Sequence, residues 1–344
     1  MPSSISSSEP SAGPVRSRGA WLAVWIGAAI LAVAALLTVE IHWRRAGYEP
    51  TVIDSPQLWS IQRGRVYGKQ PIPLVLLGAS RTEYGIDPKV LRDALPKYKP
   101  VMLALNATYP LATLRDLAAD ADFSGVVLCD LESFAFTPIF WDMQQPVIDY
   151  YRRRWTPSWH LHRVLLTWWQ RLALIANPDF GATATVRRLF DGGAPTRNYV
   201  EYHASRGGDI DYTKADPEAV KRHFAATVEG NLARMPKPDP DRWLADLQPV
   251  FDWVRAIQAR GGQVIFYESP TSGLTRQIDE RVFPRNQYWD RFTAASPSPV
   301  LSARDVPSLA STPLPDDSHI DYRDKPAYTR ALAEALIERG WLKR

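Results

Sequence analysis

The sequence has few of the side chains on which disulfide bonding, metal binding and nucleic-acid recognition depend. Its single cysteine, Cys129, excludes an intrachain disulfide. Four of its six histidines are scattered over residues 160–223 without a carboxylate at ligand spacing, so we expect no metal site and no cofactor. The net charge of +4 is small for 344 residues, and no basic stripe interleaved with aromatic residues indicates a nucleic-acid partner.

The N-terminal region contains the longest uncharged run of the sequence. Residues 1–19 are rich in Ser, Pro and Gly and too poor in apolar side chains to build a core, which predicts a disordered tail. Residues 20–39 carry no charge, and at helical rise they span about 30 Å, the thickness of a bilayer's hydrocarbon core. We predict an uncleaved transmembrane helix over 20–43, because the run is longer than that of a signal peptide and no small-x-small cleavage site follows it.

Beyond a linker over residues 44–70, apolar runs alternate with helical patterns. The runs predict strands over 74–77, 101–105, 126–128, 264–267 and 300–302. Strands that alternate with helices predict an α/β fold, with a mainly parallel sheet covered by helices on both faces. We therefore expect one α/β domain over residues 71–344.

A long insertion interrupts this pattern over residues 136–240, and it is far longer than an ordinary loop. Its first part contains five tryptophans and three consecutive arginines: Trp141, Trp155, Trp159, Trp168, Trp169 and Arg152, Arg153, Arg154. Two interpretations stay open. The tryptophans are either the core of a helical subdomain, or they form a cover that stacks on sugar rings or touches the membrane interface.

The stretch around which the domain is organised is the apolar run that ends at Gly78-Ala79-Ser80-Arg81. Asp87-Pro88 is a helix start, because Asp87 can accept from free backbone N–H groups and proline suits the first helical position. Ser80 is therefore expected in a strand-to-helix loop at the carboxyl end of a strand, where α/β proteins bind ligands. A turn residue is the simpler interpretation of an isolated Gly-x-Ser.

Near the C-terminus, Asp316-Asp317-Ser318-His319 precedes a helical segment. A carboxylate three residues before a histidine can accept from the imidazole Nδ1–H and leave Nε2 free as a base. Asp317 is the rival partner for the imidazole. Together with Ser80, these residues supply a nucleophile, a base and a group that orients the base.

This pairing resembles the SGNH (GDSL-like) hydrolase superfamily, which has a serine in a Gly-Asp-Ser-like block after its first strand and an Asp-x-x-His before its last helix. The closest resemblance is to membrane-anchored bacterial members found with exopolysaccharide and cell-wall acylation machinery. The resemblance implies a three-layer α/β/α sandwich, and catalysis by Ser80, His319 and Asp316. It also implies a single-pass inner-membrane protein with an extracytoplasmic domain, and polysaccharide and other acylation or export proteins as partners.

The sequence departs from the superfamily at two blocks that usually complete its oxyanion site. The segment 104–109 has no glycine, and the segment 127–132 has no asparagine. Asn106, Arg81 and Glu268 are the candidates for contacts with the oxyanion or the substrate, although a surface ion pair for Arg81 and a turn role for Glu268 are equally acceptable. The resemblance thus implies a serine esterase or O-acyltransferase, with a catalytically degenerate scaffold protein as the alternative.

Overall fold

The protein is described by a computed structural model that covers residues 18–344 except 197 and 234–238. The chain forms two compact units, one from residues 1–50 and 172–195 and the other from residues 51–171 and 196–344. The tail predicted over residues 1–19 lies almost entirely outside the described residues. The Ser80 and Asp316-x-x-His319 motifs both belong to the second unit.

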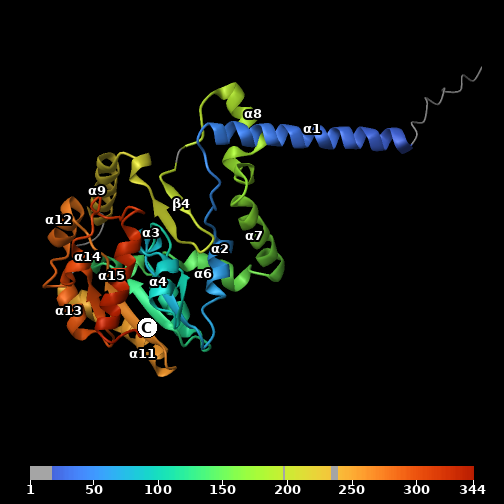
Figure 1. Cartoon of the computed structure of the whole chain (residues 1–344). Helices are drawn as coiled ribbons and strands as arrows, with labels where there is room; N and C mark the ends of the chain where they lie inside the picture. Colours follow the sequence, from blue (N-terminus) through green and yellow to red (C-terminus); the bar gives the residue numbers. More distant parts are fainter. Residues whose placement is uncertain (1–17, 197, 234–238) are drawn as a thin grey trace, which may run out of the picture. The chain divides into compact units, whose positions relative to one another are not determined.

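The first unit is built on α1, Arg18–Arg45, a helix long and apolar enough to cross a membrane. Its side chains are largely exposed, as in a candidate membrane span near the N-terminus. Trp43, near the C-terminal end of α1, packs with Leu174. Its Nε1 donates to Thr185 in α8, Ala182–Asp191. Figure 1 shows α8 next to this end of α1.

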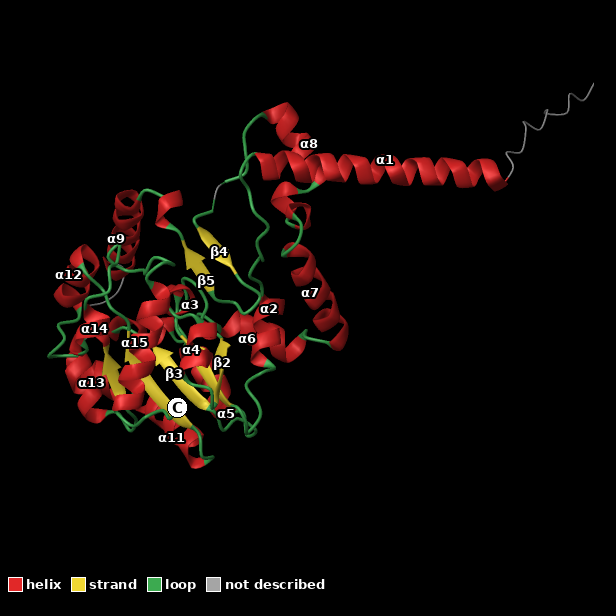
Figure 2. Cartoon of the chain, in the orientation of Figure 1, coloured by secondary structure: helices red, strands yellow, loops and turns green. Residues whose placement is uncertain are grey.

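The second unit contains a parallel five-stranded sheet with the order β2-β1-β3-β6-β7. Its strands are β1 Ile72–Leu77, β2 Tyr98–Met102, β3 Val126–Asp130, β6 Gln263–Glu268 and β7 Val300–Ser302. Four of them lie at predicted runs, because strands buried on both faces are continuous apolar stretches. The edge strand β2 contains Lys99 and shares only Val101 and Met102 with the predicted run 101–105. Figure 2 shows the strands running in one direction.

Two apolar cores cover the two faces of this sheet. Alternate residues of β1 divide between them, with Val75 and Leu77 on one side and Leu74 and Leu76 on the other. The first core takes side chains from α2 Pro56–Arg63, α5 Leu111–Ala119, α11 Gln248–Ala259, α12 Gly273–Val282 and α13 Trp289–Ala295. The second takes them from α4 Pro88–Ala94, α14 Pro307–Ala310 and α15 Lys325–Glu338. The sheet is therefore the middle of three layers, which confirms the predicted fold class.

The strand order reverses direction between β1 and β3, since β2 lies outside β1 while β6 and β7 lie beyond β3. In open α/β sheets, ligands bind beyond the carboxyl ends of the strands at such a reversal. The loop after β1 carries Ser80, so the topology places the predicted nucleophile at this position.

Two regions differ in detail from the sequence-based expectation. The segment 44–70, predicted as a linker, contains α2, whose Ser55 cap accepts from Leu58 N. The insertion contains helices α6 Gln145–Arg153, α7 Pro157–Gln170 and α9 Pro217–Ala233, and it also contains an antiparallel pair, β4 Val200–Tyr202 and β5 Gly208–Ile210. The helix α10, Pro240–Ala245, follows the insertion.

Candidate active site

The turn after β1 is tight because it brings Gly78 against Thr82. A Cβ on Gly78 would lie 2.3 Å from the Thr82 hydroxyl oxygen, so only glycine fits there. Thr82 belongs to α3, Ser80–Gly85, a short helix that the sequence pattern did not indicate. Ser80 is thus the first residue of a helix rather than part of a longer loop.

Asp130, at the end of β3, is hydrogen-bonded to the segment after this turn and to the loop after β6. Its carboxylate accepts from the Thr82 hydroxyl at 2.7 Å, and from the Ser269 hydroxyl and backbone N–H at 2.6 and 3.0 Å. Burial raises the pKa of Asp130 to about 6, although the hydrogen bond from Ser269 lowers it. The carboxylate of Asp130 therefore links the end of β3 to the segment that follows β6 and to the segment that follows β1, close to Ser80 in the sequence.

The segment 316–319 lies directly beside the Ser80 turn. Asp316 Oδ1 accepts from the backbone N–H groups of Ser318 and His319 at 3.0 and 2.6 Å. Its Oδ2 lies 2.8 Å from His319 Nδ1, and His319 Nε2 lies 2.7 Å from Ser80 Oγ. Three side chains from motifs 239 residues apart thus form one continuous hydrogen-bonded chain.

The charge of Asp316 fixes the direction of these hydrogen bonds. Burial alone would raise the pKa of Asp316, but the hydrogen bond and charge of His319 outweigh burial and lower it to about 2. An ionised carboxylate only accepts, so Nδ1 of the imidazole must carry the proton. In the neutral imidazole, Nε2 is then the acceptor that faces the Ser80 hydroxyl.

Asp317, the rival partner of the imidazole, has a different environment. Its carboxylate accepts from the Ser272 hydroxyl at 3.0 Å and from the Leu274 backbone N–H at 2.9 Å. A Cβ on Gly273 would lie 2.3 Å from the same carboxylate. Asp317 therefore joins the loop after β6 to the histidine segment, while Asp316 contacts His319.

Arg81 is held inside the protein by two partners. Its guanidinium forms an ion pair with Glu132 and donates from Nε to the Ser318 hydroxyl at 2.9 Å. These bonds connect the residue after Ser80 with the residue before His319. The geometry therefore fits a role in fixing the distance between nucleophile and base, and the guanidinium is already paired with a carboxylate.

A cavity of about 130 Å³ opens beside Ser80. Its walls combine aromatic and acidic side chains, among them Tyr109, Phe134, Phe224, Glu132 and Asp279. The Phe224 ring also packs edge-on against the imidazole of His319, with 5.4 Å between ring centroids. Burial raises the pKa of Asp279 to about 7, and the Arg81 charge lowers it only in part.

The loop after β2 contributes Ala107 and Tyr109 to this cavity, but not Asn106. Asn106 is exposed, its backbone N–H donates to Glu83 Oε2 at 2.9 Å, and it does not line the cavity. Ala107 does line it, and has a φ of 59°, a conformation that glycine usually adopts. Ala107 thus has a left-handed backbone conformation without being glycine, which sequence alone could not reveal.

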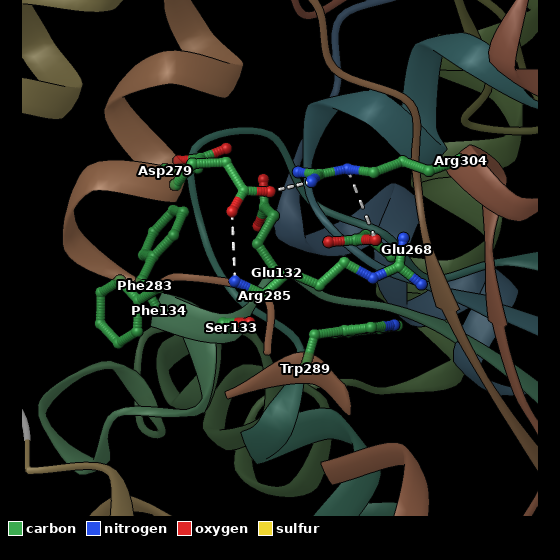
Figure 3. Close-up of a pocket in the computed structure, with 10 residues that line it drawn as sticks. Glu132, Ser133, Phe134, Glu268, Asp279, Phe283, Arg285, Trp289 and Arg304 are labelled. Atoms are coloured by element: carbon green, nitrogen blue, oxygen red, sulfur yellow. Dashed lines mark hydrogen bonds and ion pairs between the residues drawn. The ribbon is translucent and has the colours of Figure 1, made fainter. Parts of the chain in front are cut away.

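Glu268 borders a neighbouring cavity rather than that of Ser80 (Figure 3). Its carboxylate accepts from the Ser302 hydroxyl and lies 3.9 Å from the Arg304 guanidinium. In the same cavity Arg304 pairs with Glu280, whose carboxylate also accepts from the Arg285 backbone N–H at 3.1 Å. The position at the end of β6 was predicted, but Glu268 lines the neighbouring cavity and not that of Ser80.

Among the residues that the structure describes, no group of three or more His, Cys, Asp or Glu side chains could hold a metal ion. The comparisons with known proteins add little to this geometry. No protein-family model matches the sequence, and no curated protein matches it. Among solved structures, the chain is similar to a crystal structure of TesA, with 10% identity and a TM-score of 0.37 over 77% of this chain and 97% of that chain.

Proposed function

We propose that this protein is a membrane-anchored serine esterase or O-acyltransferase of the SGNH type. The observation that carries the proposal is the chain of contacts from Asp316 through His319 to Ser80, with 2.8 and 2.7 Å between the successive heavy atoms. Serine becomes a useful nucleophile when an adjacent base takes its proton and a third group orients that base.

In the proposed reaction, Ser80 Oγ attacks the ester carbonyl carbon while His319 Nε2 takes the hydroxyl proton. The carbon–oxygen bond of the ester then breaks, and the imidazolium returns the proton to the leaving alcohol oxygen. Water or a sugar hydroxyl next attacks the acyl-serine, with His319 again taking the proton. Water gives hydrolysis, and a sugar hydroxyl gives acyl transfer.

The oxyanion of each tetrahedral intermediate needs hydrogen-bond donors placed before the reaction begins. The backbone N–H groups of Ser80 and Ala107 are the candidates. Both residues line the cavity, and no hydrogen bond from either N–H occurs among the described residues. This assignment replaces Asn106, whose backbone N–H is already used by Glu83.

The size of the cavity favours a short acyl group such as acetyl. Its volume of about 130 Å³ is well below the roughly 300 to 1,000 Å³ of pockets for drug-sized ligands. The leaving alcohol would be a hydroxyl of a cell-envelope polysaccharide, delivered by other acylation or export proteins. This part of the proposal rests on the resemblance and on α1 as a single inner-membrane span with the second unit outside the cytoplasm.

The activity is tested on the full-length protein in nanodiscs, with a small aryl acetate and with acetylated glycans as substrates. Wild type should release acetate or transfer it to a glycan hydroxyl, and Ser80→Ala should not. Ser311→Ala is the matched control, because Ser311 is exposed and does not line the Ser80 cavity. Wild type that turns over no ester, even in native membranes with glycan present, would favour the scaffold alternative.

The topology is tested separately by reporter fusions after Arg344. Alkaline phosphatase, which folds outside the cytoplasm, should be active at this position. An inactive phosphatase fusion together with an active cytoplasmic reporter at the same site would reverse the proposed orientation.

A further inference from the structure

Helix α7 of the insertion has its apolar and polar faces reversed relative to an ordinary surface helix. Leu161, Leu165 and Trp168 follow one another at helical spacing and are 61%, 57% and 63% exposed. Val164 and Trp169 flank this stripe and are exposed as well. A surface helix of a globular protein normally turns such a stripe toward the core.

The opposite face of α7 is polar and buried. Arg163, Thr167 and Gln170 recur on this face, and all three are buried. Arg163 donates to the Ile53 carbonyl at 2.7 Å and to Gln170 Oε1 at 3.1 Å, and the Ile53 N–H donates to the same oxygen at 3.3 Å. Specific hydrogen bonds therefore fix which face of α7 is outward.

The chain after α7 leads directly to the end of the candidate span. Only residues 171–173 separate Gln170, the last residue of α7, from Leu174 in the sequence. Leu174 packs against Trp43 near the end of α1. The carboxylate of Glu40 in α1 accepts from the Leu174 and Ile175 backbone N–H groups at 3.1 and 3.0 Å.

A second exposed apolar pair lies in the unit that contains α1. In α8, Val186 and Phe190 are one helical turn apart and are 51% and 86% exposed. Thr185 of the same helix is held by Trp43 Nε1 at 3.0 Å. Exposed apolar residues therefore occur both in the helix that packs at the end of α1 and in the helix that leads to it.

We propose that the Leu161, Leu165 and Trp168 face of α7 lies in the lipid interface of the bilayer that α1 spans. The inference rests on α1 being a membrane anchor, as proposed above, and it assigns a second, interfacial attachment. Tryptophan and leucine on one face are typical of helices that lie in the interface. The exposed Arg154 and Arg171 at the two ends of α7 would reach the phosphate groups of the lipids.

Spin labels on the full-length protein in nanodiscs test this placement. Cysteines are introduced singly at Leu161, Leu165 and Trp168, and Leu274→Cys in α12 is the control, since Leu274 is an exposed leucine outside α7. Native Cys129 is completely buried and does not compete for the label. Collision rates with oxygen and with a water-soluble nickel complex report lipid and water around each label.

The α7 labels should collide severalfold more with oxygen, and severalfold less with the nickel complex, than the Leu274 label. The same water exposure on α7 as at the control would overturn the inference. So would labels shielded from both reagents and broadened by a second spin, because another copy would then cover the face. Retention of the chain in carbonate-washed membranes tests the anchor, and ester turnover tests the proposed activity, so each failure is recognised separately.

Discussion

Two neighbouring cavities share a wall of Glu132, Phe134 and Asp279, but the hydrogen bonds and ion pairs of their polar side chains differ. In the cavity of Figure 3, carboxylates face guanidinium groups. Burial would raise the pKa of Glu280, but its hydrogen bond with Arg304 lowers it instead. In the Ser80 cavity the hydrogen-bonded chain ends at the hydroxyl of Ser80, a residue that lines the open space. Matched charges hold elements together, whereas a chain that ends in a serine beside a base is suited to chemistry.

The largest effect should come from breaking the chain at the nucleophile or at the base. Ser80→Ala and His319→Ala should each lower kcat on a small acetate ester by roughly 10³- to 10⁶-fold, and the double variant should lose little more, because triad residues act as a unit. Initial rates on the full-length protein measure this. His223→Ala, at an exposed histidine, is the matched control. Losses that add in the double variant would contradict the shared role.

A smaller loss should follow from Asp316→Asn, which keeps the size of the side chain but removes its charge. The variant should lose roughly 10²- to 10⁴-fold in kcat, because the amide no longer fixes the imidazole tautomer. KM should change little, since Asp316 does not line the cavity. An equal loss in Asp317→Asn with none in Asp316→Asn would assign the orienting role to the rival residue.

Arg81→Met should have a weaker effect on catalysis, because Arg81 positions the two motifs without reaching the reacting atoms in the proposed mechanism. Loss of its bond to Ser318 should let the nucleophile and base separate, at a cost of about 10²-fold in kcat. KM for a neutral ester should stay near the wild-type value. Arg81→Lys, which keeps the charge but not the two-partner geometry, should not restore kcat. A rise in KM alone would instead indicate that Arg81 binds substrate.

The smallest predicted effect is on stability, and it comes from Asp279, whose side chain lines both cavities. The pKa of Asp279 is about 7 in the fold and about 4 in the unfolded chain, so the folded state keeps a proton that the unfolded state loses between these values. Its contribution to stability therefore falls as the pH rises from about 4 to 7. As the pH rises through this window, the free energy of unfolding of Asp279→Asn should gain about 1–2 kcal/mol relative to wild type. This figure is smaller than the full pKa shift would give, because the side chain is partly exposed to solvent.

Urea unfolding at several pH values measures this difference. Asp93→Asn is the control, since the Asp93 side chain is 65% exposed. A constant difference between Asp279→Asn and wild type from pH 4 to 7 would mean that Asp279 is ionised throughout. The two cavities would then be alike in the state of their carboxylates.

The sequence predicted most of the sheet because β1, β3, β6 and β7 contain apolar runs, whereas β2 carries Lys99 and begins three residues before its predicted run. It selected Ser80, Asp316 and His319 because short motifs encode local turns. The structure brings these three residues together. Features that depend on distant parts of the chain were not predictable. The left-handed conformation of Ala107 has no glycine to mark it, and Asp279 reaches the cavity wall only through folding of α12.

The same limit explains the residues whose placement differs from expectation. Glu268 ends β6 as expected, whereas Asn106 lies four residues beyond the end of β2, and the contacts of each depend on neighbours that the pattern does not contain. Glu83 takes the Asn106 N–H, and Ser302 and Arg304 take the Glu268 carboxylate. For the tryptophan-rich segment, the sequence left a core and an exposed cover both open. The structure exposes Trp159, Trp168 and Trp169 of α7.

The central claim is that Ser80 is a nucleophile activated by His319, and covalent labelling tests it most directly. The full-length protein in nanodiscs is treated with a fluorophosphonate, and the adduct is located by peptide mass spectrometry. The account predicts one adduct per chain, on the peptide that contains Ser80, which is absent in Ser80→Ala and strongly reduced in His319→Ala. Folded wild type that forms no adduct, or forms one on another serine while Ser80 stays unmodified, would contradict the account.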